Sequence, residues 1–184
     1  IYTLSLHDAL PILAVERILM GHALIAGYGG IPLIYMGDEI AMLNDDSYLD
    51  DPEKRHDSRW IHRPEMDWAT VYRVRQGGCE TPAGRVFDGL CHILDRRRAT
   101  PELHGDIPVH MLTSPDARIF VMRHDAPTGA MLCIYNFSED WCGLPGEWLI
   151  EQGANRLHDA LSDSPVELKG GNLALPPYAR VWLR

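Results

Sequence analysis

Residues 29–39 read GGIPLIYMGDE, and this stretch decides the expected fold. An apolar run from Ile31 to Met36 lies between two glycines and a Gly-Asp-Glu tripeptide, with Pro32 near its start. A short apolar run of this kind is typical of a strand that is buried on both faces, as in a parallel sheet. We therefore predict a strand over Pro32–Met36.

The residues before this run have the periodicity of a helix. Apolar side chains recur at spacings of three and four from Ala14 to Ala26, and three glycines follow by position 30. Glycine commonly ends a helix because it adopts left-handed backbone angles at little cost. A helix that leads into a buried strand is half of a β-α-β unit, so we expect an α/β domain here.

A polar stretch follows the apolar run as far as Arg63. It carries eight carboxylates between Asp38 and Asp57. The stretch is either a solvated surface loop or an active-site loop after a barrel strand, since long unstructured loops are usually functional. A calcium site is disfavoured because the D-x-[DN]-x-[DN]-G spacing is absent.

The second half of the chain changes from helical to strand-like texture. A helix is predicted over Ala83–Arg98, whose last turn carries three arginines that suit the helix dipole. From about Gly105, short β-type runs alternate with turn clusters, which predicts an antiparallel β-sandwich over residues 107–184. The predicted strands cover residues 109–112, 117–123, 130–135, 148–150, 156–160, 166–168, 173–175 and 179–183.

Composition excludes several classes of protein. The chain is 46% hydrophobic and 23% charged, which is ordinary for a globular protein. A net charge of −9 argues against a nucleic-acid binder. No apolar run approaches the roughly 18 residues of a membrane span. Four cysteines without a CxxC pair indicate reduced thiols in a cytosolic protein, with a Cys133–Cys142 disulfide as the alternative.

Residues 1–12, IYTLSLHDALPI, do not read as a natural N-terminus. Reverse-translated, all twelve codons resemble a common short-read sequencing adapter. A signal peptide would need a basic segment followed by an apolar one, whereas no Lys or Arg precedes Arg17 and His7 and Asp8 interrupt the apolar run. We interpret residues 1–12 as an artefactual leader and the remainder as a C-terminal fragment.

No complete catalytic motif is present, but residues 57–64 (DSRWIHRP) concentrate polar chemistry. They hold two arginines, an indole and an imidazole, and arginine pairs bidentately with carboxylates. Two interpretations stay open from the residues alone. Arg59 or Arg63 is tied to a nearby carboxylate in a structural salt bridge, or the group forms a sugar site in which an aromatic ring contacts the apolar face of the sugar.

Residues 29–39 resemble the eighth-strand motif of the α-amylase clan of glycoside hydrolases, family 13. The later segments LNDD (43–46), DSRWIHRP (57–64) and MDW (66–68) are similar to those of amylosucrases and sucrose hydrolases. The final segment LPPYARVWL (175–183) resembles the last strand of the clan's C-terminal sandwich.

The resemblance implies an α/β plus all-β architecture. Residues 13–103 would be the last helix, strand, loop and helix of a (β/α)₈ TIM barrel, and residues 104–184 a C-terminal β-sandwich. The implied parent is a retaining glucosyltransferase that cleaves sucrose and extends an α-1,4-glucan. The alternatives are a sucrose hydrolase, another glycosidase of this family, or a non-catalytic carbohydrate-binding β module.

The resemblance also implies roles for individual residues. The catalytic Asp and Glu would lie upstream, so the fragment alone is expected to be inactive. Arg59 would bind substrate, because the matching arginine pairs with an upstream Asp at the bottom of the glucosyl pocket. The supporting residues would be Asp57, His62, Arg63, Asp38 and Glu39. The implied partners are sucrose, α-glucan and the missing barrel segment, with no metal, cofactor, nucleic acid or membrane, in the cytoplasm.

One departure from the family pattern concerns the residue before Asp57. This residue is His56, where an acidic residue is common in amylosucrases. The departure changes the local charge pattern around the motif and leaves the arginine in place.

Overall fold

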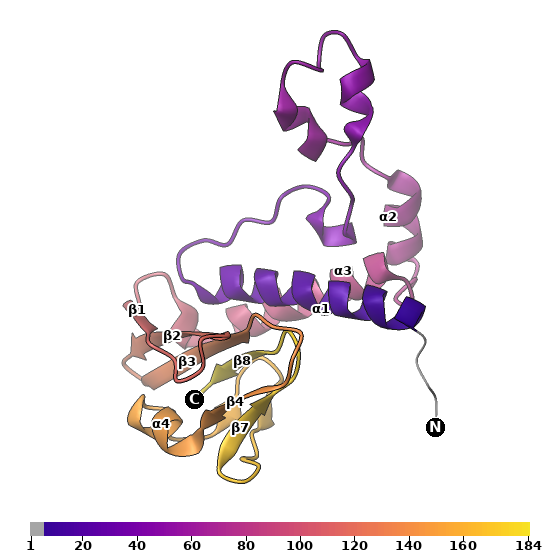
Figure 1. The fold of residues 1–184 in the computed structure, drawn as a ribbon. Coiled ribbons are helices and arrows are strands. Elements are labelled where there is room, and N and C mark those ends of the chain that lie inside the picture. The colour runs from indigo at the N-terminus through magenta and orange to yellow at the C-terminus, as the bar shows by residue number, and fades with distance from the viewer. Residues whose placement is uncertain (1–5) are drawn as a thin grey trace. The chain divides into compact units, whose positions relative to one another are not determined.

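A computed structural model of the chain describes residues 6–184, with side chains from residue 12 onward (Figure 1). The chain forms two compact units. The first comprises the residues up to Leu33 together with Gly89–Arg184, and the second comprises Ile34–Asp88. Among the described residues, no helix combines the length and the apolar character needed to cross a bilayer.

Two long helices contribute to the first unit. Helix α1 spans Leu6–Gly27, and helix α3 spans Pro82–Arg98, of which the part from Gly89 belongs to this unit. The helices approach closely at Gly89, where a Cβ atom would come within 2.6 Å of the Leu19 side chain. Both predicted helices are confirmed. Because α1 begins at Leu6, its backbone includes part of the stretch interpreted as a leader, whereas residues 1–5 lie outside the described residues.

Most of the rest of the first unit belongs to two antiparallel sheets (Figure 1). The larger has the strand order β1-β2-β3-β8-β5-β6, and the smaller pairs β4 with β7. The strands are β1 (Val109–Leu112), β2 (Ile119–Ala126), β3 (Gly129–Asn136), β4 (Cys142–Pro145), β5 (His158–Asp159), β6 (Ser164–Pro165), β7 (Asn172–Leu175) and β8 (Arg180–Leu183). A short 3-10 helix, η4 (Pro101–Leu103), precedes β1.

Both sheets contribute to one apolar core. Val121 and Ile134 face each other across the β2–β3 pair, and both are fully buried. The same cluster includes Leu144 and Leu175 from the smaller sheet and Leu149 from helix α4 (Gly146–Glu151). Burial of such side chains stabilises a fold by about 1.5–3 kcal/mol each. This core therefore holds the two sheets and α4 together.

Some predicted strands are wrong. Residues 148–150 lie in helix α4, where Pro145 stands at the N-cap and Glu147 in the first turn. A three-residue apolar run is too short for its periodicity to distinguish helix from strand. Residues 166–168 form no strand, because the pairing segment is Ser164–Pro165, and strand β4 was not predicted at all.

The predicted strand Pro32–Met36 is also wrong. Residues 31–35 have no regular secondary structure, and Met36 begins a turn. A strand requires a neighbouring strand to accept and donate its backbone hydrogen bonds. The described residues provide no such neighbour for this run, and Ile31 and Leu33 remain 97% and 77% exposed. The apolar pattern is present without the partner that would make it a strand.

Side chains from the β-sheet and α3 cap the C-terminal end of α1. The last carbonyls of a helix have no intrahelical partner and need other donors. Tyr135 Oη donates to the carbonyl of Ala23 at 3.0 Å, and Arg97 donates to that of Ala26. His124 Nε2 lies 2.7 Å from the carbonyl of Gly27 and must therefore carry the proton. These bonds join the α1 terminus to the sheet.

The buried imidazole of His124 predicts a pH-dependent stability. Burial lowers the pKa of His124 below its ordinary value, nearby Arg97 lowers it further, and Asp125 opposes the shift. In the unfolded chain this histidine protonates near pH 6.5. The unfolded state therefore binds a proton first, so the free energy of unfolding should fall as the pH decreases from about 6.5.

Urea unfolding between pH 5 and pH 8 measures this effect. Replacing His124 with Gln should flatten the pH dependence in the acid range, whereas replacing the exposed His56 with Gln should leave it unchanged. If the free energy of unfolding of the His124→Gln protein fell with decreasing pH as steeply as that of the wild type, the role assigned to His124 would be wrong.

Candidate functional site

The second unit contains three short 3-10 helices and one α-helix. These are η1 (Asp38–Ile40), η2 (Asp46–Asp50), η3 (Ser58–His62) and α2 (Trp68–Arg75), followed by the first residues of α3. A cavity of about 420 Å³ lies within this unit. Its lining is Tyr35, Met36, Gly37, Asp38, Met42, Leu43, Asn44, Arg59, His62, Arg63 and Pro64.

Aspartates organise this unit by capping helices. Asp45 accepts a hydrogen bond from the backbone of Ser47 at 2.9 Å at the start of η2. Asp57 does the same for η3 and Asp67 for α2, each at 3.0 Å. A side-chain cap satisfies a backbone N–H that the helix leaves unpaired. Part of the acidic character of residues 38–57 is therefore structural, and no three potential ligands in the described residues converge on a metal position.

Arg59 forms a two-pronged ion pair with Asp57. The guanidinium donates from Nε to Oδ1 at 2.8 Å and from Nη2 to Oδ2 at 2.7 Å. The hydrogen bonds from the Arg59 side chain and backbone hold the pKa of Asp57 at about 2. The pair is solvent-accessible, with the Arg59 side chain 75% exposed. The local salt bridge, one of the two interpretations left open by the sequence, is therefore present.

The same arrangement occurs at Asp116 and Arg118 in the first unit. There Nε and Nη2 of Arg118 donate to the two carboxylate oxygens at 3.0 and 2.7 Å. Both segments have the order Asp-x-Arg, and in both the aspartate also accepts the backbone N–H of the arginine. The fork thus arises from local sequence, and it uses only one edge of the guanidinium. Arginine has five N–H donors, so the other edge of Arg59 can bind a second carboxylate.

Asp38 and Glu39 differ in their positions. Asp38 lines the cavity, whereas Glu39 is not among the lining residues. Glu39 Oε2 accepts the backbone N–H of Gly37 at 2.7 Å, at a residue with a φ of 101°. The carboxylate of Glu39 therefore stabilises the turn that leads into η1.

His62 and Arg63 both line the cavity, and each contacts a neighbouring side chain. His62 Nδ1 lies 3.0 Å from Oδ1 of Asn44. The Arg63 guanidinium lies 5.6 Å from the ring centre of Trp60, and the Lys54 ammonium lies 5.0 Å from it. Trp60 lies near both cations and does not line the cavity, whose aromatic lining residue is Tyr35.

The fork predicts a positioning effect for Asp57. In a full-length enzyme of the kind that the sequence resemblance implies, Asp57→Asn should lower kcat/KM because an amide offers Arg59 only one acceptor oxygen, and the guanidinium loses its fixed plane. We expect a decrease of about tenfold, which corresponds to about 1.4 kcal/mol. Asp116→Asn is the matched control, because it removes the same local fork from a part of the chain outside the cavity. Equal kinetic effects of the two substitutions would disprove a site-specific role.

Comparison with known proteins shows what parts of the chain are similar to. Residues 109–184 match the family model described as amylosucrase, C-terminal domain. Among solved structures, the chain is similar to AmyP in complex with maltose, with 16% identity and a TM-score of 0.68 over 98% of this chain and 36% of that one. Two further similar structures are hydrolases.

The ligand-free cyclic α-maltosyl-(1→6)-maltose hydrolase from Arthrobacter globiformis has 18% identity and a TM-score of 0.59, covering 92% of this chain and 30% of its own. The trehalose-6-phosphate hydrolase of Bacillus licheniformis has 14% identity and a TM-score of 0.60, covering 92% and 39%. The present chain therefore spans about a third of the length of these proteins. The chain therefore resembles these proteins in fold, and its residues 109–184 match the model of the amylosucrase C-terminal domain.

Proposed function

We propose that the chain is the C-terminal part of an amylosucrase-like retaining glucosyltransferase. The parent would cleave sucrose, release fructose and transfer the glucosyl unit to an α-1,4-glucan in the cytoplasm. The match of residues 109–184 to the amylosucrase C-terminal domain carries this proposal. The cavity beside the DSRWIHRP segment supports it, because a volume of about 420 Å³ is in the range of small-molecule sites.

In this proposal, residues 13–103 are the end of a TIM barrel and residues 104–184 a C-terminal β-sandwich. Large apolar side chains of the proposed barrel part support it, because a folded protein normally covers such groups. Leu43 is 85% exposed, Trp68 72% and Met36 64%. The upstream barrel segment would cover them and supply the catalytic Asp and Glu. The fragment alone should therefore not turn over sucrose.

The chain's own contribution would be to close the glucosyl pocket. Asp57 fixes one edge of the Arg59 guanidinium, and the opposite edge would pair with an Asp from the upstream segment. A carboxylate pair bridged by one arginine forms a rigid, planar group. With this group closing its bottom, the pocket would hold a single glucosyl unit. It would therefore favour sucrose over a long glucan as donor.

Two alternatives differ from this proposal. One catalyses a different reaction, and the other has no catalytic activity. A sucrose hydrolase, or another glycosidase of the family, would transfer the glucosyl unit to water, as the hydrolase names of similar structures suggest. A non-catalytic carbohydrate-binding module would bind glucan without turnover. All three proposals include a carbohydrate ligand. The similar structures of AmyP are described with bound maltose or maltotriose.

Product analysis of the full-length parent separates these proposals. The enzyme is incubated with sucrose and a glycogen primer, and fructose, free glucose and glucan length are measured. Transfer predicts more fructose than glucose together with longer glucan chains. Equal amounts of fructose and glucose would indicate a hydrolase and contradict transfer, whereas glucan binding without product would indicate the binding module.

A further inference from the structure

Asn44 and His62 form a pair at the cavity that has no role in the proposal above. They are 18 residues apart in sequence, and Asn44 Oδ1 lies 3.0 Å from His62 Nδ1. Both residues line the cavity. The neighbouring backbone groups are also bonded, because the N–H of Asp45 donates to the carbonyl of Ile61 at 3.0 Å. This backbone bond joins the two segments that carry the pair.

The chemistry of the pair determines the tautomer of His62. A carboxamide oxygen can accept a hydrogen bond and cannot donate one. Nδ1 must then carry the proton, and in the neutral ring Nε2 is left as an acceptor. Asn44 thus converts an imidazole with two possible proton positions into one with a defined donor and a defined acceptor.

The charged residues that line the rest of the cavity explain why a further hydrogen-bond acceptor is useful there. Arg59 and Arg63 are donors only, and Asp38 is the carboxylate of the lining. A sugar hydroxyl both donates and accepts hydrogen bonds, so a site that holds one needs acceptors as well as donors. Nε2 of His62 adds a neutral acceptor to a lining in which arginines supply the donors.

We propose that Asn44 is a positioning residue that fixes His62 as the Nδ1–H tautomer, so that Nε2 accepts a hydrogen bond from a hydroxyl group of the glucosyl unit. This inference rests on the proposed function, because it places a glucosyl unit in this cavity. It goes beyond that function because it names the residue that fixes the tautomer of His62. It also names the ring nitrogen that accepts the hydrogen bond from the hydroxyl group.

Kinetics of four variants of the full-length parent test the proposal. Asn44→Ala should lower kcat/KM on sucrose by about tenfold, as expected for a lost hydrogen bond to substrate, and His62→Ala by at least as much. The double variant should be no worse than His62→Ala alone, because both changes remove the same interaction. At a pH high enough to keep the ring neutral beside a carboxylate, Asn44→Asp should stay within about threefold of wild type, because a carboxylate also accepts from Nδ1–H.

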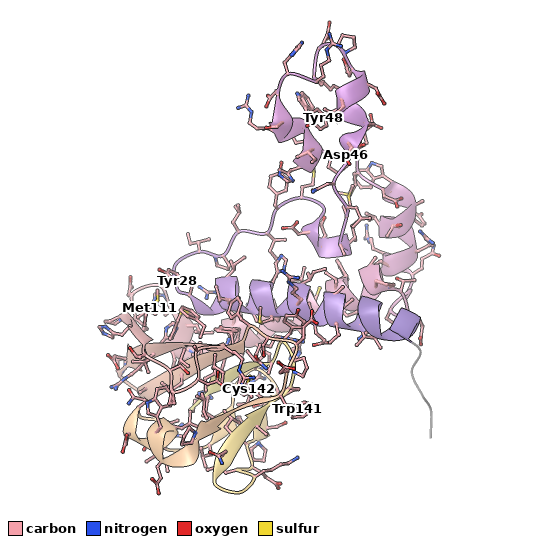
Figure 2. The ribbon with its side chains drawn as sticks, viewed as in Figure 1. Tyr28, Asp46, Tyr48, Met111, Trp141 and Cys142 are labelled. Carbon is pink, nitrogen blue, oxygen red and sulfur yellow. The ribbon has the colours of Figure 1, made fainter. Side chains whose placement is uncertain are left out.

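Asp46→Ala is the matched control. Asp46 is exposed, lies two residues from Asn44 in η2 and is not among the lining residues (Figure 2). It should change kcat/KM little. Additive effects of Asn44→Ala and His62→Ala, or a loss in Asn44→Asp as large as in Asn44→Ala, would overturn the proposal.

A spectroscopic measurement separates this inference from the proposed function. Nitrogen NMR of the ¹⁵N-histidine-labelled parent reports which ring nitrogen carries the proton, and the signal of His62 is identified by its absence in His62→Gln. We expect protonated Nδ1 in wild type and Asn44→Asp, and a shift towards protonated Nε2 in Asn44→Ala. Protonated Nε2 in wild type would overturn the inference even if sucrose is cleaved. If another α-glucoside is the substrate, the proposed function fails, and the same variants are measured on that substrate.

Discussion

Replacing Arg59 with alanine in the parent enzyme is expected to lower kcat/KM on sucrose by about a hundredfold. The substitution would leave the aspartate that we propose as its upstream partner buried without a counter-charge, which costs about 3–5 kcal/mol at buried sites. If about 3 kcal/mol of this acts on the transition state, the rate falls by about two orders of magnitude. The pocket floor would also open, so residual activity should shift towards longer α-glucans.

Arg59→Lys should restore little of this activity. An ammonium group cannot form two parallel hydrogen bonds with one carboxylate, as the Arg59 guanidinium does with Asp57. It also lacks the second edge that would pair with the proposed upstream aspartate in the same way. If Arg59 made only its exposed pair with Asp57, the loss would affect stability by at most about 1 kcal/mol and leave turnover nearly unchanged. Kinetics of both variants with melting temperatures decide the question, and an alanine variant with more than about a third of wild-type kcat/KM would contradict the pocket role.

Replacing Asn136 with alanine should destabilise the β-sheet part of the chain by about 3 kcal/mol or more. The side chain is fully buried, and Nδ2 donates to the carbonyls of Asp140 and Pro176, each at 2.8 Å. Oδ1 accepts from the backbone and the hydroxyl of Ser138 at 3.0 and 2.7 Å. Alanine would remove these four hydrogen bonds, at a net cost of about 0.5–1.5 kcal/mol for each.

Chemical unfolding of the wild type and two variants measures this effect. Asn172→Ala is the control, because Asn172 is exposed and donates only locally, to the carbonyl of Gly170 at 3.2 Å. We expect its effect to be within about 0.5 kcal/mol. A loss below about 1 kcal/mol for Asn136→Ala would show that the surrounding groups find other partners.

The elements that the sequence predicts well are those whose signal is local. The stripe of Ala14–Ala26 specifies a helix through its own backbone bonds, and it forms as expected within α1. The run Pro32–Met36 depends on neighbours that the described residues do not provide, so its pattern cannot become a strand. Residues 148–150 fail for a different reason. Their signal is local but too short, since three apolar residues fit a helical turn as well as a strand.

The candidate site shows the same distinction between local and distant information. The Arg59–Asp57 fork could be anticipated, because an arginine two residues after an aspartate repeats the geometry at Asp116 and Arg118. The pairing of His62 with Asn44 could not, since it joins residues 18 positions apart. The aspartate expected opposite Arg59 would lie upstream, so its pairing with Arg59 stays a prediction.

The most direct test of the proposed function is a donor comparison in the full-length parent. Initial rates are measured with sucrose and with maltotriose as the only donor, under the same conditions. The proposal predicts fructose release from sucrose with a kcat/KM well above that for cleavage of maltotriose, because a closed pocket floor accepts a single glucosyl unit. Cleavage of maltotriose with no release of fructose from sucrose would contradict it.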